Sequence, residues 1–271
     1  MKRKNMYLIG ALAIIIIVGA ALTITNSDNS SRIDVVGSTS VQPVVEKLVD
    51  EYKKSHPDSQ INVQGGGSSV GIKSASDGTA DIGTSSKELD DSDKKGLKEY
   101  KLGNDGIVIV TNNQNTISDL STEQLKDIFS GKVTNWNQVG GSDGEIHVVT
   151  REEGSGTLDA FESIVMGDAK IISNAVVQSS TEAVKQSVSQ DPNAIGFISF
   201  ANMGDEVKSI SVNGVMPSEE TLADNSYEIQ RPFLLLTKGE PSGDVKDFID
   251  WVMSDEGSKI LADEKIIKSS K

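Results

Sequence analysis

The sequence predicts an α/β protein with mostly parallel sheets, and three observations lead to this prediction. Short apolar runs of strand length alternate along the chain with segments whose apolar residues recur at helical spacing. Loops rich in glycine, serine and threonine follow several of these runs and precede a helical segment. The chain has 271 residues, 36% hydrophobic and 24% charged, which is an ordinary globular composition and is long enough for two lobes.

The N-terminal segment has the composition of a membrane anchor. Basic residues 2–4 precede an apolar run over residues 7–24, which at about 1.5 Å per residue is roughly 27 Å long, near the thickness of a bilayer's hydrocarbon core. We expect an anchor over residues 1–25, with the basic flank in the cytoplasm and the remaining chain outside. Cleavage as a signal peptide near residues 19–21 is the alternative. Residues 26–31 are polar and are expected to form a flexible stalk.

The first part of the folded region alternates strand and helix. Apolar runs predict strands over 33–36 and 61–64. Between them, apolar residues at helical spacing from Val41 to Tyr52 form one buried stripe of a helix. Ser40 is expected to cap this helix, because a hydroxyl there accepts from the free N–H groups of the first turn. The next expected elements are a short helix over 69–77 and strands over 81–84 and 106–111.

The second part continues the same alternation. Ser121 and Gln124 form a capping box that opens a helix ending at Gly131. A strand over 146–150 delivers Arg151 at its carboxyl end. The later expected elements are helices over 158–165 and 181–190, strands over 176–178, 195–198 and 233–237, and a final long helix with Val245, Phe248, Ile249, Val252 and Met253 on one face.

The composition excludes several classes of function. The absence of cysteine excludes disulfides, thiolate metal sites, a cysteine nucleophile and a lipid-modified cysteine anchor. The two histidines, His56 and His147, have no second histidine nearby, so we expect neither a metal site nor a cofactor. The formal net charge of −14 offers no basic face, so a nucleic-acid partner is not expected.

Three loops rich in hydroxyl groups lie where strands are expected to end. Each precedes a predicted helix, whose N-terminus presents free N–H groups and a partial positive charge. Arg151 adds a guanidinium that can bind an oxyanion through two parallel hydrogen bonds, and Ser86 ends a further strand. Because ligands of such sheets bind beyond the carboxyl ends of the strands, we expect one cage for a small tetrahedral oxyanion. The candidate residues are Ser38, Thr39, Ser40, Ser68, Ser69, Ser86, Arg151, Ser155, Gly156 and Thr157.

The same loops allow other interpretations. Arg151 can instead pair with Glu152 or Glu153 on the surface, with the glycines making a simple turn. The run Gly67–Gly71 matches the G-x-S-x-G pattern of hydrolases, but only His147 follows as a base and it lies in a predicted strand, so no enzyme is expected. Nor does lysine follow Gly71 directly, as a P-loop requires.

Glu153 is expected to select the anion. A carboxylate beside an anion is repulsive unless the ligand donates a proton to it. Hydrogen phosphate carries such a proton, whereas sulfate at neutral pH carries none, so a carboxylate facing the ligand would accept phosphate and reject sulfate. This selection requires that Glu153 faces the ligand.

Four stretches together resemble a known family. They are Gln64–Ser69, Ile128–Trp136, Ala194–Ile198 and the run from Arg231 to Pro241. In these stretches the chain is similar to the phosphate-binding proteins of the phosphate-specific ABC transporter, and the resemblance extends from Ile33 to about Leu261. By motif position, the family's ligand contacts fall on Thr39, Ser40, Ser68, Ser86, Arg151, Glu153, Ser155, Gly156 and Thr157.

Three departures from the family matter for the site and the anchor. Some family members carry aspartate where this chain has Ser86, and some carry it where this chain has Glu153. The first departure removes an acceptor, so discrimination between phosphate and sulfate depends more on Glu153. The anchor cysteine is absent, and we expect the apolar N-terminal segment to replace it.

The resemblance implies a two-lobed type II periplasmic-binding-protein fold with a ligand cleft between the lobes. We expect the first lobe to contain residues 33–110 and 231–271 and the second residues 111–230, because the strong strands 106–111 and 233–237 can pass from one lobe to the other. The implied function is extracytoplasmic high-affinity binding of inorganic phosphate, delivered to the permease subunits of an ABC importer. The protein is expected to be a monomer, either anchored by its N-terminal helix or secreted after cleavage. The alternatives are a surface adhesion protein on the same fold or a binder of sulfate or molybdate.

Overall fold

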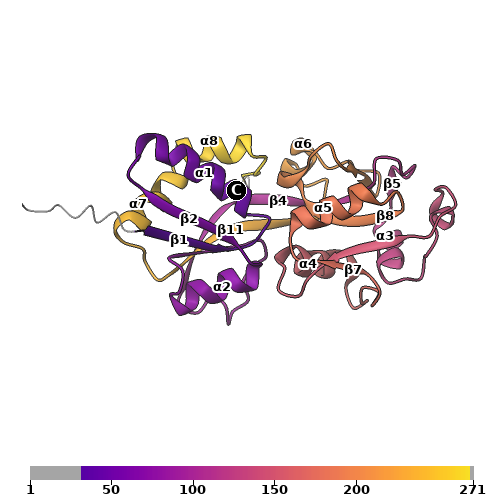
Figure 1. Cartoon of the computed structure of the whole chain (residues 1–271), viewed down its shortest axis with the longest axis horizontal. Helices are drawn as coiled ribbons and strands as arrows, with labels where there is room; N and C mark the ends of the chain where they lie inside the picture. Colours follow the sequence, from indigo (N-terminus) through magenta and orange to yellow (C-terminus); the bar gives the residue numbers. More distant parts are fainter. Residues whose placement is uncertain (1–31, 269–271) are drawn as a thin grey trace, which may run out of the picture. The chain divides into compact units, whose positions relative to one another are not determined.

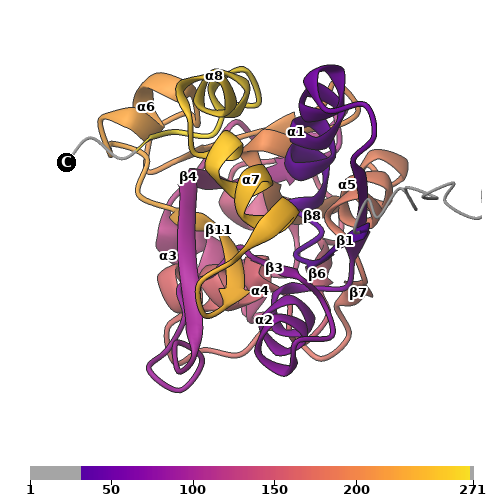
Figure 2. The same ribbon diagram turned by 90° about the vertical axis from the view of Figure 1, so that its left-hand side faces the viewer.

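The computed structural model describes residues 32–268, drawn in Figures 1 and 2. The strands are β1 (Arg32–Gly37), β2 (Gln60–Gly65), β3 (Ile82–Ser85), β4 (Leu97–Thr111), β5 (Asp119–Leu120), β6 (His147–Arg151), β7 (Val176–Gln178), β8 (Ala194–Ser199), β9 (Lys208–Ser209), β10 (Ser211–Val212) and β11 (Gln230–Lys238). The α-helices are α1 (Gln42–Ser55), α2 (Ser68–Asp77), α3 (Thr122–Phe129), α4 (Gly156–Phe161), α5 (Thr181–Gln190), α6 (Glu219–Ala223), α7 (Gly243–Val252) and α8 (Asp255–Asp263). Two 3₁₀ turns, η1 (Trp136–Val139) and η3 (Phe200–Asn202), and one π-helical turn, η2 (Glu162–Met166), complete the described elements.

Most strands join one sheet in the order β2-β1-β3-β11-β4-β8-β6-β7, and the long strand β4 connects its two halves. The first part of β4 pairs antiparallel with β11, and its last five residues, Ile107–Thr111, pair antiparallel with β8. Parallel pairs lie outside these central strands, between β1 and its neighbours β2 and β3 and between β6 and its neighbours β7 and β8. The sheet is therefore mixed, because β4 and β11 run in opposite directions between the two halves.

The hydrophobic core divides into two lobes around this sheet. In the first lobe, Phe233 and Leu235 of β11 pack with α1, α7 and α8, whereas Leu234 and Leu236 pack with α2 on the opposite face. This alternation is the period of two that a strand imposes. In the second lobe, β4 and β8 likewise send alternate residues toward α3 and α4 on one face and toward α5 on the other. Figure 1 shows the first-lobe helices α1 and α8 and the second-lobe helices α4 and α5 on either side of β4 and β11.

The carboxyl ends of the parallel strands place the hydroxyl-rich loops. In the first lobe, Gly37 of β1 lies opposite Gly65 of β2 and Thr84 of β3, so the three strands end at one edge. In the second lobe, Arg151 of β6 lies opposite Gln178 of β7. A helix begins just after four of these ends: α1 after β1, α2 after β2, α4 after β6 and α5 after β7.

The structure corrects several expectations about the elements. The expectation of mostly parallel sheets is wrong at the centre, where β4 also begins at Leu97 rather than at residue 106. Val41, not Ser40, is the N-cap of α1 and makes no side-chain capping bond. The Ser38 hydroxyl accepts from the backbone N–H groups of Ser40 and Val41, and the Ser40 hydroxyl makes contacts away from the helix. The expected final helix is α7, which ends at Val252 and leaves Met253 exposed, and it is followed by a further helix, α8, that was not predicted.

Three expectations are not tested by the described residues. The anchor over residues 1–25 and the stalk over 26–31 lie outside the described residues. Among residues 32–268, none of the helices has the length and apolar character needed to cross a bilayer. The lobe boundaries near residues 110 and 231 stay a prediction.

Candidate anion-binding site

Hydroxyl groups from both lobes meet where the strands end. Ser40, in the loop between β1 and α1, shares hydrogen bonds of 2.9 Å with Thr157 at the start of α4 and with Thr181 at the start of α5. All three residues are buried. Loops from different lobes are thus joined directly by their side-chain hydroxyls, as the sequence predicts for Ser40 and Thr157 but not for Thr181.

A second group of hydroxyls gathers the three loops of the first lobe. Ser38 donates to the Ser86 hydroxyl at 2.9 Å, and the hydroxyls of Ser68 and Ser86 lie 3.2 Å apart. The backbone N–H of Ser86 also donates to Ser68 Oγ at 3.0 Å. These contacts bring together the residues that follow β1, β2 and β3, as predicted. We call the buried hydroxyls described so far the hydroxyl cluster; its members are Ser38, Ser40, Ser68, Ser86, Thr157 and Thr181.

Gly156 allows the two lobes to approach each other closely at this cluster. A Cβ atom at Gly156 would lie 2.7 Å from Ser86 Oγ and still nearer to Ser68 Oγ, both in the first lobe. Such distances are too short for any side chain, so only glycine fits between α4 and these serines. Nearby, the backbone N–H of Ser69 donates to the carbonyl of Gly154 at 3.1 Å, which adds a direct bond between the lobes.

Arg151 lies at the edge of the cluster and is only 2% exposed through its side chain. Its Nη2 donates to Thr39 Oγ1 at 3.1 Å and its Nη1 donates to Thr181 Oγ1 at 3.2 Å. Its Nε and Nη2 also donate, at 2.9 Å each, to the two carboxylate oxygens of Glu152. The ion pair with Glu152 is therefore present, but on a buried guanidinium rather than on the surface, and the contact of Arg151 with an anion stays a prediction.

The remaining predicted residues take other places. Glu153 is exposed, so this structure does not bring it into the hydroxyl cluster. Ser69 is also exposed and contributes through its backbone. Ser155 is buried as the N-cap of α4, where its hydroxyl accepts from the N–H of Leu158 at 3.3 Å. It therefore shapes the loop that presents Gly156 and Thr157.

A second arginine, which sequence reasoning did not assign to the site, lies inside the cluster. Arg231 of β11 donates from Nη1 to Thr157 Oγ1 at 2.6 Å and from Nη2 to Ser40 Oγ at 3.1 Å. Its Nε and Nη2 donate to Oδ2 of Asp105 on β4, at 3.2 and 3.1 Å. Arg231 and Asp105 are also directly opposite each other in the antiparallel pairing of these strands.

Burial disfavours the charged form of both members of this ion pair and shifts the pKa of each accordingly. It raises the pKa of Asp105 and lowers the pKa of Arg231 to about 10, while the attraction between the two charges opposes both shifts. Asp105 Oδ1 also accepts from Ser199 Oγ at 2.8 Å and from the N–H of Ala201 at 3.1 Å. Because every one of these contacts is a donor to a carboxylate oxygen, they favour the ionised form of Asp105 and hence a charged Arg231.

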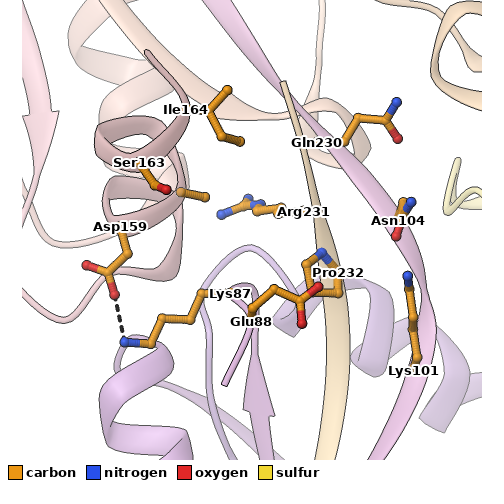
Figure 3. Close-up of a pocket in the computed structure, with 11 residues that line it drawn as sticks. Lys87, Glu88, Lys101, Asn104, Asp159, Ser163, Ile164, Gln230, Arg231 and Pro232 are labelled. Atoms are coloured by element: carbon orange, nitrogen blue, oxygen red, sulfur yellow. Dashed lines mark ion pairs between the residues drawn. The ribbon is translucent and has the colours of Figure 1, made fainter. Parts of the chain in front are cut away.

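A pocket of about 510 Å³ lies beside the cluster, with Arg231 in its wall. Figure 3 shows Arg231 extending from β11 toward the helix that carries Asp159 and Ser163. At one side of the pocket, Lys87 of the first lobe forms an ion pair of 2.8 Å with Asp159 of α4 in the second lobe. Among the described residues, no group of three or more histidine, aspartate and glutamate side chains is arranged to hold a metal ion.

The sequence contains signals for the residues that were missed. Ser179-Ser180-Thr181 is a hydroxyl-rich loop after a strand and before a helix, the same pattern as the three loops that were identified. Arg231 is one of only four arginines in the chain and stands at the start of an apolar run. Asp105 had no such signal, because its role depends on the pairing of two strands that are distant in sequence.

The chain is similar to a known family and to known proteins. The family model described as PBP superfamily domain matches residues 24–256. Phosphate-binding protein PstS of Bacillus subtilis is 29% identical over 98% of this chain and 94% of its own length. PstS of Staphylococcus epidermidis is 31% identical over 87% of this chain and 78% of its own length.

Solved structures agree with these relatives. A Clostridium perfringens crystal structure with bound phosphate, assigned as a phosphate ABC transporter substrate-binding protein, is 40% identical over 88% of this chain and all of its own, with a TM-score of 0.85. An ABC-type phosphate transport receptor from Vibrio cholerae is 36% identical over 87% of this chain and 99% of its own, with a TM-score of 0.72. The chain therefore belongs to the PBP superfamily and, within it, to the family of PstS phosphate-binding proteins.

Proposed function

We propose that this protein binds inorganic phosphate outside the cytoplasm and delivers it to an ABC-type importer. The observation that carries the proposal is the convergence of six buried hydroxyl groups and two buried guanidinium groups from both lobes at the carboxyl ends of the strands. Such a set of donors matches a small oxyanion with several equivalent oxygen atoms. The PstS relatives and the phosphate-bound C. perfringens structure support the choice of phosphate.

Binding would exchange hydrogen bonds within the protein for hydrogen bonds to the anion. Hydroxyls that now bond to one another, such as Ser40 with Thr157, would each donate to a phosphate oxygen. An anionic oxygen is the stronger acceptor, so this exchange is favourable. Because the donors belong to both lobes, the anion would favour the form in which the lobes are in contact. No bond of the ligand is broken, and we expect no turnover of phosphate esters.

The finer features of the role are also part of the proposal. We expect the lobes over residues 33–110 with 231–271 and over 111–230 to move relative to each other, and a lobe surface to dock on the permease subunits. We expect a monomer that is held at the membrane by its N-terminal segment. The relatives named as ABC transporter proteins support the transport role.

Titration of the purified full-length chain tests the proposal. Isothermal titration calorimetry with inorganic phosphate should give a dissociation constant of about 1 μM or lower, on the order of −8 kcal/mol. Sulfate and molybdate, titrated in the same buffer, should bind more weakly. Equal or tighter binding of either anion would contradict the assignment to phosphate, and no binding of any of the three would favour the adhesion alternative.

A further inference from the structure

We propose that Arg231 is a second cationic ligand of the anion and that Asp105 positions it. This inference rests on the proposed phosphate-binding function and assigns a charged residue on a linking strand to the site. The guanidinium of Arg231 touches hydroxyls from three separate loops: Ser40, Ser86 and Thr157. It therefore lies where the loops meet, rather than at their edge.

The donors of Arg231 are divided between two partners. A guanidinium has five N–H groups. The Nε group and one N–H of Nη2 bind Asp105, whereas the other contacts, from Nη1 to Ser86 and Thr157 and from Nη2 to Ser40, are made to hydroxyl oxygens. These hydroxyls are neutral acceptors. An anionic oxygen among them would be the stronger acceptor for the same N–H groups.

Asp105 is built to hold Arg231 and not to meet the anion. Its Oδ2 accepts twice from Arg231, and its Oδ1 accepts from Ser199 and from the backbone of Ala201. The side chain is fully buried at 0% exposure, and that of Arg231 is 1% exposed. With both oxygens engaged twice, Asp105 fixes the rotamer of Arg231 and directs its remaining N–H groups toward the hydroxyl cluster.

Arg151 and Arg231 reach the cluster from different parts of the fold. Arg151 stands at the end of β6 in the second lobe, and its carboxylate partner, Glu152, is 29% exposed. Arg231 stands on β11 and lies opposite Asp105 of β4, the residue before Gly106. From Ile107 onward, β4 pairs with β8 of the second lobe. An anion bound to both arginines would therefore contact the second lobe and the strands that link the lobes at once. The same guanidinium lines the pocket in Figure 3.

The decisive variants keep shape and remove charge. Arg231→Gln removes the guanidinium but leaves Asp105 buried without its partner, so it also threatens folding. The double variant Asp105→Asn/Arg231→Gln removes both charges together and is expected to unfold at a temperature at least as high as the single variant. The matched control is Arg32→Gln/Asp34→Asn, an exposed pair of the same residue types with side chains 58% and 38% exposed.

The measurement is phosphate titration of each full-length variant, paired with thermal unfolding followed by circular dichroism. Loss of a buried charged partner should weaken phosphate binding roughly 30-fold or more in Arg231→Gln. The double variant should keep this weakened binding although its unfolding temperature recovers, because the ligand contact is still missing. Asp105→Asn alone should weaken binding less than Arg231→Gln, and the control pair should bind as the parent does.

The outcomes separate the two proposals. If the parent binds phosphate and the double variant binds it within about threefold of the parent, Arg231 has only a structural role and the inference is overturned. If binding and unfolding temperature fall and recover together across the variants, the inference is likewise overturned. If the parent itself does not bind phosphate, the proposed function fails first, and with it the inference that rests on it.

Discussion

Gly156→Ala tests whether the contact between the lobes seen here is the form that binds the anion. The added Cβ would lie 2.7 Å from Ser86 Oγ, whereas ordinary contact begins at 3.4 Å, so either the serine hydroxyl must rotate away from α4 or the lobes must separate there by 0.7 Å, the difference between these distances. In the second case a hydrogen bond across the lobes such as Ser40–Thr157, now 2.9 Å long, would stretch to about 3.6 Å and cease to be one.

The expected loss follows from either displacement. An anion held by both lobes would lose at least one hydrogen bond from one of them, worth about 1.5–3 kcal/mol for a charged acceptor. Phosphate affinity should therefore fall between roughly 10-fold and 150-fold. Folding should change little, because alanine is a better helix former than glycine and Gly156 opens α4 without a positive φ.

Calorimetric titration of Gly156→Ala, with Gly66→Ala as the matched control, is the assay. Gly66 lies in the neighbouring loop, and a Cβ there would meet only the side chain of Val70, at 3.3 Å; that side chain is 45% exposed and free to move. The control should bind phosphate as the parent does. If Gly156→Ala also binds phosphate as tightly as the parent, the close approach of the lobes at Gly156 is not a feature of the bound form and the reasoning is refuted.

Three further predictions concern the charges around the cluster. Arg151→Ala should weaken phosphate binding by about 2–5 kcal/mol, measured by the same titration; unchanged affinity would show that phosphate binds elsewhere in the protein. If Glu153 selects the anion, Glu153→Gln should raise sulfate affinity relative to phosphate affinity about tenfold or more. Glu152→Gln is the comparison, because Glu152 is the carboxylate that binds Arg151 here. A change of the sulfate-to-phosphate ratio in Glu152→Gln alone would show that Glu152, and not Glu153, selects the anion. Lys87→Met should change the free energy of unfolding by less than about 1 kcal/mol in urea denaturation, since its bond to Asp159 is partly exposed, and a larger loss would mean that this pair holds the lobes together.

Much of the fold could be predicted from local patterns. The apolar stripe from Val41 to Tyr52 and the capping box at Ser121 and Gln124 are signals that one segment carries by itself, and both helices form as expected, α3 with its capping box complete. The expected last helix corresponds to α7, whereas α8 was not predicted; Ser254, which caps α8, directly follows the C-cap of α7.

The site divides in the same way between local and distant information. Loops that follow strands and precede helices were identified from their own residues, and the structure brings most of their hydroxyls together. Asp105 and Arg231 were missed because their meeting requires β4 to pair with β11, which is separated from it by more than a hundred residues. The sequence left open whether Glu152 or Glu153 pairs with Arg151. In the structure Glu152 pairs with Arg151 and Glu153 is exposed, an outcome that depends on the direction of the turn after β6.

The hydroxyl cluster has a consequence for how fast an anion is captured. Several of its hydrogen bonds join two hydroxyls of which either can donate, as between Ser40 and Thr157 or Ser68 and Ser86. A rotation about one C–O bond turns such a group from acceptor to donor while every heavy atom stays in place, so the network can reverse its polarity within the time of a single bond rotation. Serine and threonine hydroxyls also keep their protons throughout the physiological pH range. Capture at these groups should therefore be limited by diffusion and lobe motion, and its pH dependence should follow the ionisation of phosphate itself.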